Sequence, residues 1–170
     1  MREKTVNESL TTMTEMVMPN DANPMGNLMG GNLMRWMDIV GGIAAGKHCE
    51  AITVTASVDN ISFQKPIHVG DIVTLKAQVT RAFNTSVEVY VEVSTHNIKG
   101  QNPQRSNNAY FTFVALDDDT KKPIKVPKFI PISEEEQRLF EGASRRREVR
   151  LVLSGRMKPD EAKDLKALFS

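Results

Sequence analysis

The feature that most limits the fold of this chain is one change in the spacing of its apolar residues. Between Leu33 and Ala44 they recur at steps of three and four, the spacing of a helix face. The apolar stretches that follow have the two-residue period of strands, over residues 52–63, 72–81, 86–96 and 108–116. One more strand pattern, over residues 10–18, precedes the helix. Strands in a row with one segregated helix predict an α+β fold, an antiparallel sheet with the helix on one face.

The composition changes after the last strand pattern, where charged residues replace the apolar alternation. Ser133 and Glu136 have the spacing of a capping box, which predicts a helix from there through Arg147. A second, shorter helix is expected near the end of the chain. We therefore predict two parts, a sheet-and-helix domain over residues 1–131 and a C-terminal helical extension over residues 132–170.

Charge and composition exclude several classes of protein. The 170 residues carry a formal net charge of +1, so no global field favours nucleic acid or an anionic membrane. Residues 1–8 do not read as an export leader, and the weakly polar stretch 39–46 is too short to span a bilayer. The single cysteine, Cys49, fits a reducing compartment. We expect a cytoplasmic protein without nucleic-acid or membrane partners.

The sequence contains no motif that indicates a metal site or a nucleotide site. The three histidines, His48, His68 and His96, stand apart, and no His or Cys pair has the spacing of metal ligands. The sequence has no Walker loop, no Gly-x-Ser-x-Gly elbow and no dinucleotide fingerprint. A catalytic site in this chain must therefore use groups other than a bound metal, a serine elbow or a bound nucleotide.

Asp38 is the most informative single residue, because it interrupts an otherwise apolar helix pattern. Gly41 and Gly42 follow it, and each costs a helix about 1 kcal/mol relative to alanine. A helix tolerates that cost where something approaches its backbone closely, and a carboxylate beside such a surface is a candidate base. Alternatively, Asp38 is exposed and paired with Arg35 on the wet face. The residues alone leave both interpretations open.

The loop before this helix supplies a second candidate element. Gly30 and Gly31 would present backbone N–H groups at the positive end of the helix dipole, where they can stabilise an oxyanion. They can equally be glycines that let the chain turn. Asn23, earlier in the same loop, is able to orient a water or a substrate carbonyl, or to serve as a plain turn residue.

Several blocks occur in one order across residues 10–131. They are Pro19–Gly31 with Trp36-Met37-Asp38, Val54–Asp59, Phe63–Pro66, Val69–Asp71 and Phe111–Ala115. Together they closely resemble the signature of the hotdog-fold acyl-CoA hydrolases. Five ordered blocks are far more specific than any one motif. Residues 132–170 are not covered to the same degree.

This resemblance implies a long helix wrapped by an antiparallel sheet, and hydrolysis of acyl-CoA to free CoA and a carboxylic acid. It implies a dimer with active sites at the interface, three such dimers forming a homohexamer, and no cofactor besides the CoA of the substrate. Asp38 would be catalytic, Asn23 would line the site, and the N–H groups of Gly30 and Gly31 would serve as oxyanion donors. Whether Asp38 activates water or attacks the carbonyl directly stays open.

CoA contacts are also implied. The turn that holds Arg81, Asn84, Thr85 and Ser86 resembles a CoA-contacting segment of the family, and Ser57 is a further substrate-binding candidate. The run Arg145-Arg146-Arg147 would suit a CoA phosphate of a neighbouring chain. The alternative for that run, a solvated helix face, is slightly favoured.

Two other functions compete with the thioesterase. A non-catalytic regulator of the same fold would bind acyl-CoA without cleaving it, and would need an added DNA-binding module that the sequence does not indicate. A hotdog dehydratase would need a histidine near the helix. His48 is the candidate, about two and a half helical turns beyond Asp38. Both rank below the thioesterase.

Overall fold

The computed structural model describes residues 2–59 and 61–170. The strands are β1 (Glu3–Lys4), β2 (Thr11–Met16), β3 (Ile52–Asp59), β4 (Ile72–Ala82), β5 (Ser86–His96), β6 (Gln104–Leu116) and β7 (Lys128–Phe129). The helices are α1 (Gly30–Cys49), α2 (Glu134–Leu153) and α3 (Lys163–Lys166), with single 3₁₀ turns at Val6–Glu8, Pro19–Asp21 and Pro159–Glu161. None of the described helices is both long and apolar enough to cross a membrane.

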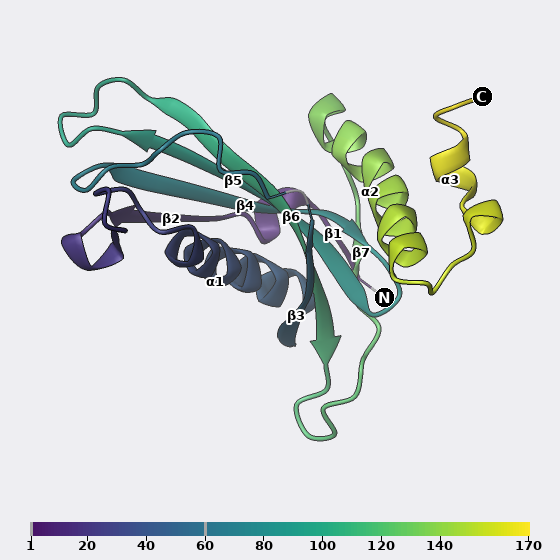
Figure 1. Cartoon of the computed structure of the whole chain (residues 1–170). Helices are drawn as coiled ribbons and strands as arrows, with labels where there is room; N and C mark the ends of the chain where they lie inside the picture. The colour runs from purple at the N-terminus through teal and green to yellow at the C-terminus, as the bar shows by residue number, and fades with distance from the viewer. Residues whose placement is uncertain (1, 60) are drawn as a thin grey trace.

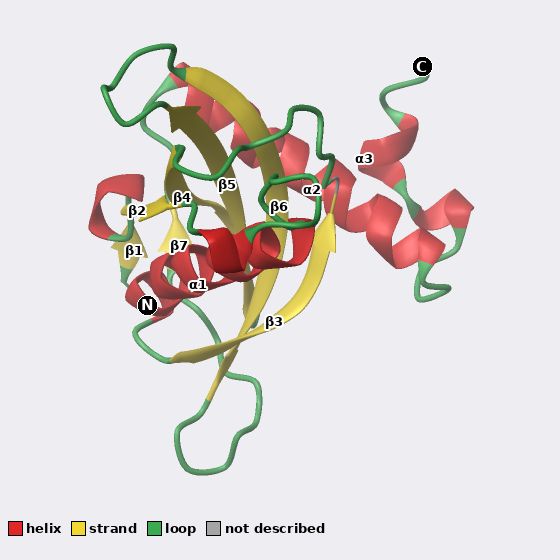
Figure 2. Ribbon diagram, turned by 60° about the vertical axis from the view of Figure 1, so that its left-hand side comes forward, coloured by secondary structure: helices red, strands yellow, loops and turns green. Residues whose placement is uncertain are grey.

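Five of the strands form one antiparallel sheet in the order β2-β4-β5-β6-β3. The sheet curves around α1, which lies along one of its faces (Figure 1). Seen from the side of α1, α2 lies behind the sheet (Figure 2). β2 and β3 are the edge strands, so both keep an unpaired row of backbone groups in the single chain. The predicted α+β architecture is confirmed.

Several boundaries differ from the predicted ones. α1 begins at Gly30, before the predicted start at Leu33. The two glycines belong to its first turn, but they have no side chain that could extend the apolar stripe. Residues 61–63 were expected to extend a strand, but β3 ends at Asp59. β6 begins at Gln104, because its polar first residues still pair with β5. β1 and β7 pair in a two-residue parallel ladder, which is too short to show any periodicity in the sequence.

The close packing of α1 on the sheet explains Gly41. A Cβ built on Gly41 would lie 3.1 Å from the ring of Phe113 in β6. Both rings of the neighbouring pair Phe111 and Phe113 are buried beneath the helix. The group that approaches the helix backbone here is therefore a core side chain and not a substrate.

α2 covers the opposite face of the sheet. The alternation of β5 is typical of a strand with one solvent-facing side, on which Glu88 would lie, but the Glu88 side chain is only 1% exposed. Arg146 of α2 donates two hydrogen bonds to the carboxylate of Glu88, of 3.0 and 2.7 Å, and its guanidinium lies 3.8 Å from the ring centroid of Tyr110. Thr80 adds a third bond to Glu88. A buried carboxylate with this many donors is fully paired.

The capping box at the start of α2 is confirmed in one half. The hydroxyl of Ser133 accepts a hydrogen bond from the Glu136 N–H at 3.2 Å. The carboxylate of Glu136, however, accepts from the N–H of Ile132 and not from that of Ser133. α2 runs six residues past the predicted Arg147 and turns at Gly155 toward α3.

Candidate active site

Asp38 lies on the face of α1 that points away from the sheet core, and it is exposed in the single chain. The hydroxyl of Thr55 in β3 donates a hydrogen bond of 2.5 Å to its carboxylate. Among the described residues Asp38 forms no ion pair with Arg35, so the alternative of a surface pair is wrong. The carboxylate is held in place by a neutral donor and stays open to a substrate.

A β-bulge directly follows Thr55. Thr55 pairs with Phe113, and the register then shifts so that Ser57 pairs with Thr112. Bulges commonly re-aim side chains beside active sites. Residues that lie directly opposite each other on paired strands share a face of the sheet. Thr112 also pairs with Glu88, so Thr112 lies on the face that α2 covers. Ser57 therefore lies on the far side of the sheet from Asp38, and its buried hydroxyl has no partner among the described residues. The sequence did not reveal that the bulge separates these two hydroxyls.

The N-terminus of α1 presents free donors. Its N-cap, Met29, provides no side-chain cap. The N–H groups of Gly30 and Gly31 donate to no acceptor within residues 2–59 and 61–170. They are the kind of unpaired donors that bind an anion or an oxyanion at a helix start.

Asn23 lies beside this helix start and also has a structural role. Its side-chain oxygen accepts hydrogen bonds from the N–H groups of Met25, at 3.0 Å, and Asn27, at 3.2 Å. Its amide nitrogen makes no hydrogen bond within the described part of the chain. Asn23 and Gly30 both line a cavity of about 390 Å³. The remaining lining residues are Asn27, Leu28, Leu33, Phe63, Gln64, Lys65, Pro66, Ile67 and Asn107.

The two candidate elements are too far apart to act on one carbonyl within a chain. Asp38 follows Gly30 by eight residues on the same helix. At 1.5 Å per residue these positions are about 12 Å apart along the helix axis. A carbonyl oxygen bound at the helix start would therefore leave its carbon out of reach of the same chain's Asp38.

Comparison with known proteins decides the family. Residues 25–99 match the Thioesterase superfamily. The acyl-CoA thioester hydrolase YkhA of Bacillus subtilis, itself uncharacterized, is 39% identical over 139 residues, which cover 82% of this chain and 80% of YkhA. The chain belongs to the acyl-CoA thioester hydrolases of the thioesterase superfamily. It is thus an enzyme with the hotdog fold.

Solved structures agree with this thioesterase along nearly its whole length. An apo-hexameric acyl-CoA thioesterase has a TM-score of 0.86 and 35% identity, with 91% of this chain and 98% of that chain covered. The Staphylococcus aureus acyl-CoA hydrolase in complex with butyryl coenzyme A, coenzyme A and coenzyme A disulfide has a TM-score of 0.84 and 33% identity, with 99% of each chain covered. Structures of that hydrolase have also been solved for three variants, in which one aspartate, one threonine or one asparagine is replaced by alanine.

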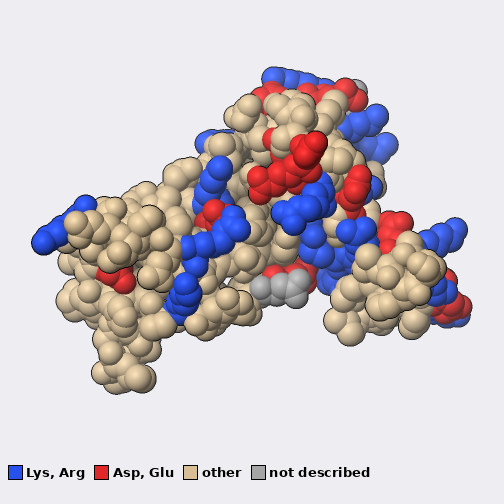
Figure 3. Space-filling view, turned by 90° about the horizontal axis from the view of Figure 1, so that it is seen from above, with Lys and Arg blue, Asp and Glu red and all other residues tan. Residues whose placement is uncertain are grey.

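The predicted CoA contacts of the thioesterase lie elsewhere on the chain. Arg81 donates to the carbonyl of Phe140 at 3.1 Å and stacks on that ring at 4.3 Å from its centroid. The backbone carbonyl of Asn84 accepts a hydrogen bond from the N–H of Val126, that of Thr85 from Ala115 in β6, and that of Ser86 from Phe83 within the turn. The side chains of this turn stay predicted contacts. Charges of both signs are interspersed over the part of the surface that carries α2 and α3 (Figure 3).

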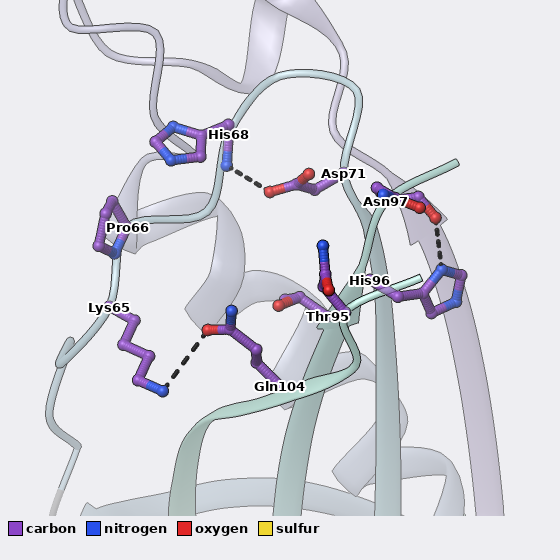
Figure 4. A pocket seen from close by; sticks show the side chains of 9 residues that line it. Lys65, Pro66, His68, Asp71, Thr95, His96, Asn97 and Gln104 are labelled. Atoms are coloured by element: carbon purple, nitrogen blue, oxygen red, sulfur yellow. Dashed lines mark hydrogen bonds between the residues drawn. The ribbon is translucent and has the colours of Figure 1, made fainter. Parts of the chain in front are cut away.

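Other reactive side chains of the thioesterase are excluded as catalytic groups, because they are buried or point away from a pocket. His48 is buried, its ring bonds to the carbonyl of Pro127, and burial lowers its pKa. Burial raises the pKa of the Cys49 thiol to about 12, so it is no nucleophile. In a polar pocket of about 330 Å³, Lys65 and Gln104 point toward each other while the rings of His68 and His96 point outward (Figure 4). Among the residues that the structure describes, neither a dehydratase histidine nor a second catalytic cluster is formed.

Proposed function

We propose that the thioesterase hydrolyses acyl-CoA at sites shared by two chains, each combining Asp38 of one chain with Gly30, Gly31 and Asn23 of its partner. The observation that carries this proposal is the separation of about 12 Å between Asp38 and the free N–H groups on one helix. Both elements are needed at one thioester carbonyl, so a second chain must supply one of them.

A two-fold arrangement of α1 meets this requirement. Met34 lies midway between Gly30 and Asp38, four residues from each. If two antiparallel copies of α1 lie side by side with the symmetry axis near Met34, Gly30 of each chain comes beside Asp38 of the other. Isologous pairing then builds two equal sites from one contact.

The surface around Asp38 suits such a contact. Large apolar side chains are exposed on the outer face of α1 and on edge strand β3, namely Met34, Ile39, Ile43, Ile52 and Val54. An exposed apolar group of this kind beside an open sheet edge marks a surface that a partner covers. Pairing of two β3 edges would join the sheets and bring the two α1 helices together. We extend this to three such dimers in a hexamer, because solved relatives of this chain include hexameric thioesterases.

The chemistry follows from these groups. With Asp38 as base, its carboxylate takes a proton from water while the water oxygen attacks the thioester carbon. The N–H groups of Gly30 and Gly31 stabilise the oxyanion. The intermediate then collapses, the C–S bond breaks, and the CoA sulfur leaves with the proton. With Asp38 as nucleophile, the carboxylate attacks first, CoA leaves, and water hydrolyses the resulting anhydride. Neither route needs a metal or another cofactor.

The three variants of the Staphylococcus aureus hydrolase support this choice of residues. The replaced asparagine precedes the replaced aspartate by 15 positions, and the threonine follows that aspartate by 17. Asn23, Asp38 and Thr55 have the same two separations. We therefore add Thr55, which the sequence did not single out, as the residue that positions Asp38.

The remaining predicted contacts have unequal support. Arg81, Asn84, Thr85 and Ser86 stay our candidates for contacts to CoA, although the Arg81 guanidinium already bonds to the Phe140 carbonyl and lies over the rings of Phe140 and Phe83. Ser57 is withdrawn, because the bulge turns it to the opposite face. A cytoplasmic location fits the buried, unpaired Cys49. A non-catalytic acyl-CoA-binding regulator on the same fold would bind the ligand but release no thiol.

Subunit mixing tests the shared site. An Asp38→Asn chain and an Asn23→Asp chain, each of which should have a strongly lowered kcat alone, are co-expressed with different tags. Random pairing makes half of the dimers mixed, and each mixed dimer has one intact site, so activity should return to about a quarter of wild type. Purification through both tags proves that mixed assemblies exist. Mixed assemblies without activity would show that both residues serve the same chain.

A further inference from the structure

Phe63 stands out because it is a large apolar side chain, 54% exposed, beside the predicted oxyanion donors. It lies within residues 61–67, which form neither helix nor strand. A Cβ built on Gly30 would lie only 3.1 Å from the tip of the Phe63 ring. The ring therefore rests on the first residue of α1, where a side chain larger than that of glycine would push it aside by a few tenths of an ångström.

The segment that carries Phe63 is tied to the sheet. The side-chain amide of Asn107, in β6, donates to the carbonyl of Ser62. The amide of Gln64 donates to the Ser62 hydroxyl at 3.2 Å, and Lys65 reaches Gln104 at 3.5 Å. Asn107 is buried and also accepts from Ser106. Phe63 is thus held on both sides by anchored residues, as a wall and not as a loose side chain.

The cavity behind this wall suits hydrocarbon. Its apolar lining comes from Leu28, Leu33, Phe63, Pro66 and Ile67. On its lining, Asn107, Gln64 and Lys65 and the side-chain oxygen of Asn23 have partners inside the chain, whereas the Asn23 amide nitrogen and the Gly30 N–H, unpaired within the described residues, stay free for the thioester carbonyl. The pantetheine arm of CoA has two amides that need partners, and burying them unpaired is costly. An acyl chain makes no such demand.

We infer that this cavity takes the acyl carbons next to the thioester, and that Phe63 is the wall that sets the acyl-chain length. This rests on the proposed function, because it places the thioester carbonyl at the N–H groups of Gly30 and Gly31. With the carbonyl oxygen at these donors, the Phe63 ring and the cavity lie beside the carbonyl, within reach of its acyl substituent. Each methylene that packs in the cavity raises kcat/KM by about four-fold, until the chain meets the wall.

The test compares chain-length profiles. kcat/KM is measured by thiol release for straight-chain acyl-CoAs of increasing length, with wild type, Phe63→Ala and Phe63→Trp. We expect the optimum to move to longer chains in Phe63→Ala and to shorter chains in Phe63→Trp. In Phe63→Ala, methylenes beyond the wild-type optimum should again add about four-fold each. Phe169→Ala, a change at an exposed phenylalanine of the tail, should keep the wild-type profile.

Other outcomes overturn the inference. An equal change of kcat/KM at every chain length would place Phe63 against the CoA arm, and an unchanged profile would remove it from the site. Thermal unfolding and size-exclusion chromatography verify each variant, and Phe63→Leu replaces Phe63→Ala if the latter does not fold. Activity of Asp38→Asn would refute the proposed function separately. An inactive Asp38→Asn with an unchanged Phe63→Ala profile refutes only this inference.

Discussion

The hydroxyl of Thr55 in β3 donates a hydrogen bond of 2.5 Å to the carboxylate of Asp38 in α1. This bond crosses from the edge strand to the central helix, and it leaves the other carboxylate oxygen without a partner among the described residues. A carboxylate fixed by one neutral donor keeps its remaining acceptor directed at a substrate. In the site that we propose, this free oxygen of Asp38 would attack, or take a proton from, a group on the partner's side.

Asp38→Asn should nearly abolish hydrolysis. Asparagine keeps the oxygen that accepts from Thr55, so folding and oligomer size should not change. Loss of a base or nucleophile should lower kcat by at least about 10²-fold. A thiol-detecting assay over several acyl-CoAs measures this, with Asp118→Asn in an exposed loop as the control. A kcat like that of wild type would remove Asp38 from the mechanism.

Thr55→Val should lower kcat with little change in KM. Valine keeps the shape but removes the donor, and a hydrogen bond to a charged group corresponds to about ten-fold or more in rate. Thr55→Ser keeps a hydroxyl and should restore most of the activity. Thr14→Val, an exposed strand threonine on the opposite edge of the sheet, is the matched control. If valine and serine behave alike, Thr55 does not position Asp38.

Asn23→Asp should lower kcat more than it raises KM. The aspartate keeps the oxygen that holds the N–H groups of Met25 and Asn27, but it loses the free amide donor. A donor that orients the carbonyl acts mainly in the transition state. Asn23→Ala loses both functions and should also loosen the loop, with a lower melting temperature. A fully active Asn23→Asp beside an impaired Asn23→Ala would leave Asn23 only its role in the turn.

Arg146→Met should destabilise the fold. It leaves the buried carboxylate of Glu88 without its charged partner, which costs about 3–5 kcal/mol of unfolding free energy. Adding Glu88→Gln removes the unpaired charge and should recover part of the loss. Denaturant unfolding at a fixed protomer concentration measures both, with Arg138→Met on the exposed face of α2 as the control. Equal stability of Arg146→Met and Arg138→Met would contradict the importance of this ion pair.

Local patterns were enough to predict most of the fold. The period of three to four placed α1, and the period of two placed β2 to β6 to within a few residues. The place of Asp38 on the helix and of Gly30 and Gly31 at its start could also be predicted. These features depend on neighbours in the sequence, since side-chain direction within one element is fixed by its own geometry.

Only the tertiary structure decided which distant residues meet. Thr55 and Asp38 are 17 residues apart and Glu88 and Arg146 are 58 apart, and no local period relates either pair. The bulge after Thr55 reversed the expected side of Ser57, because one extra residue moves the following side chains to the other face. The sequence by itself determined the helix, the strands and the candidate groups on each. Packing of the helix and of α2 against a curved sheet decided which of those groups share a site, because such contacts depend on the arrangement of whole elements.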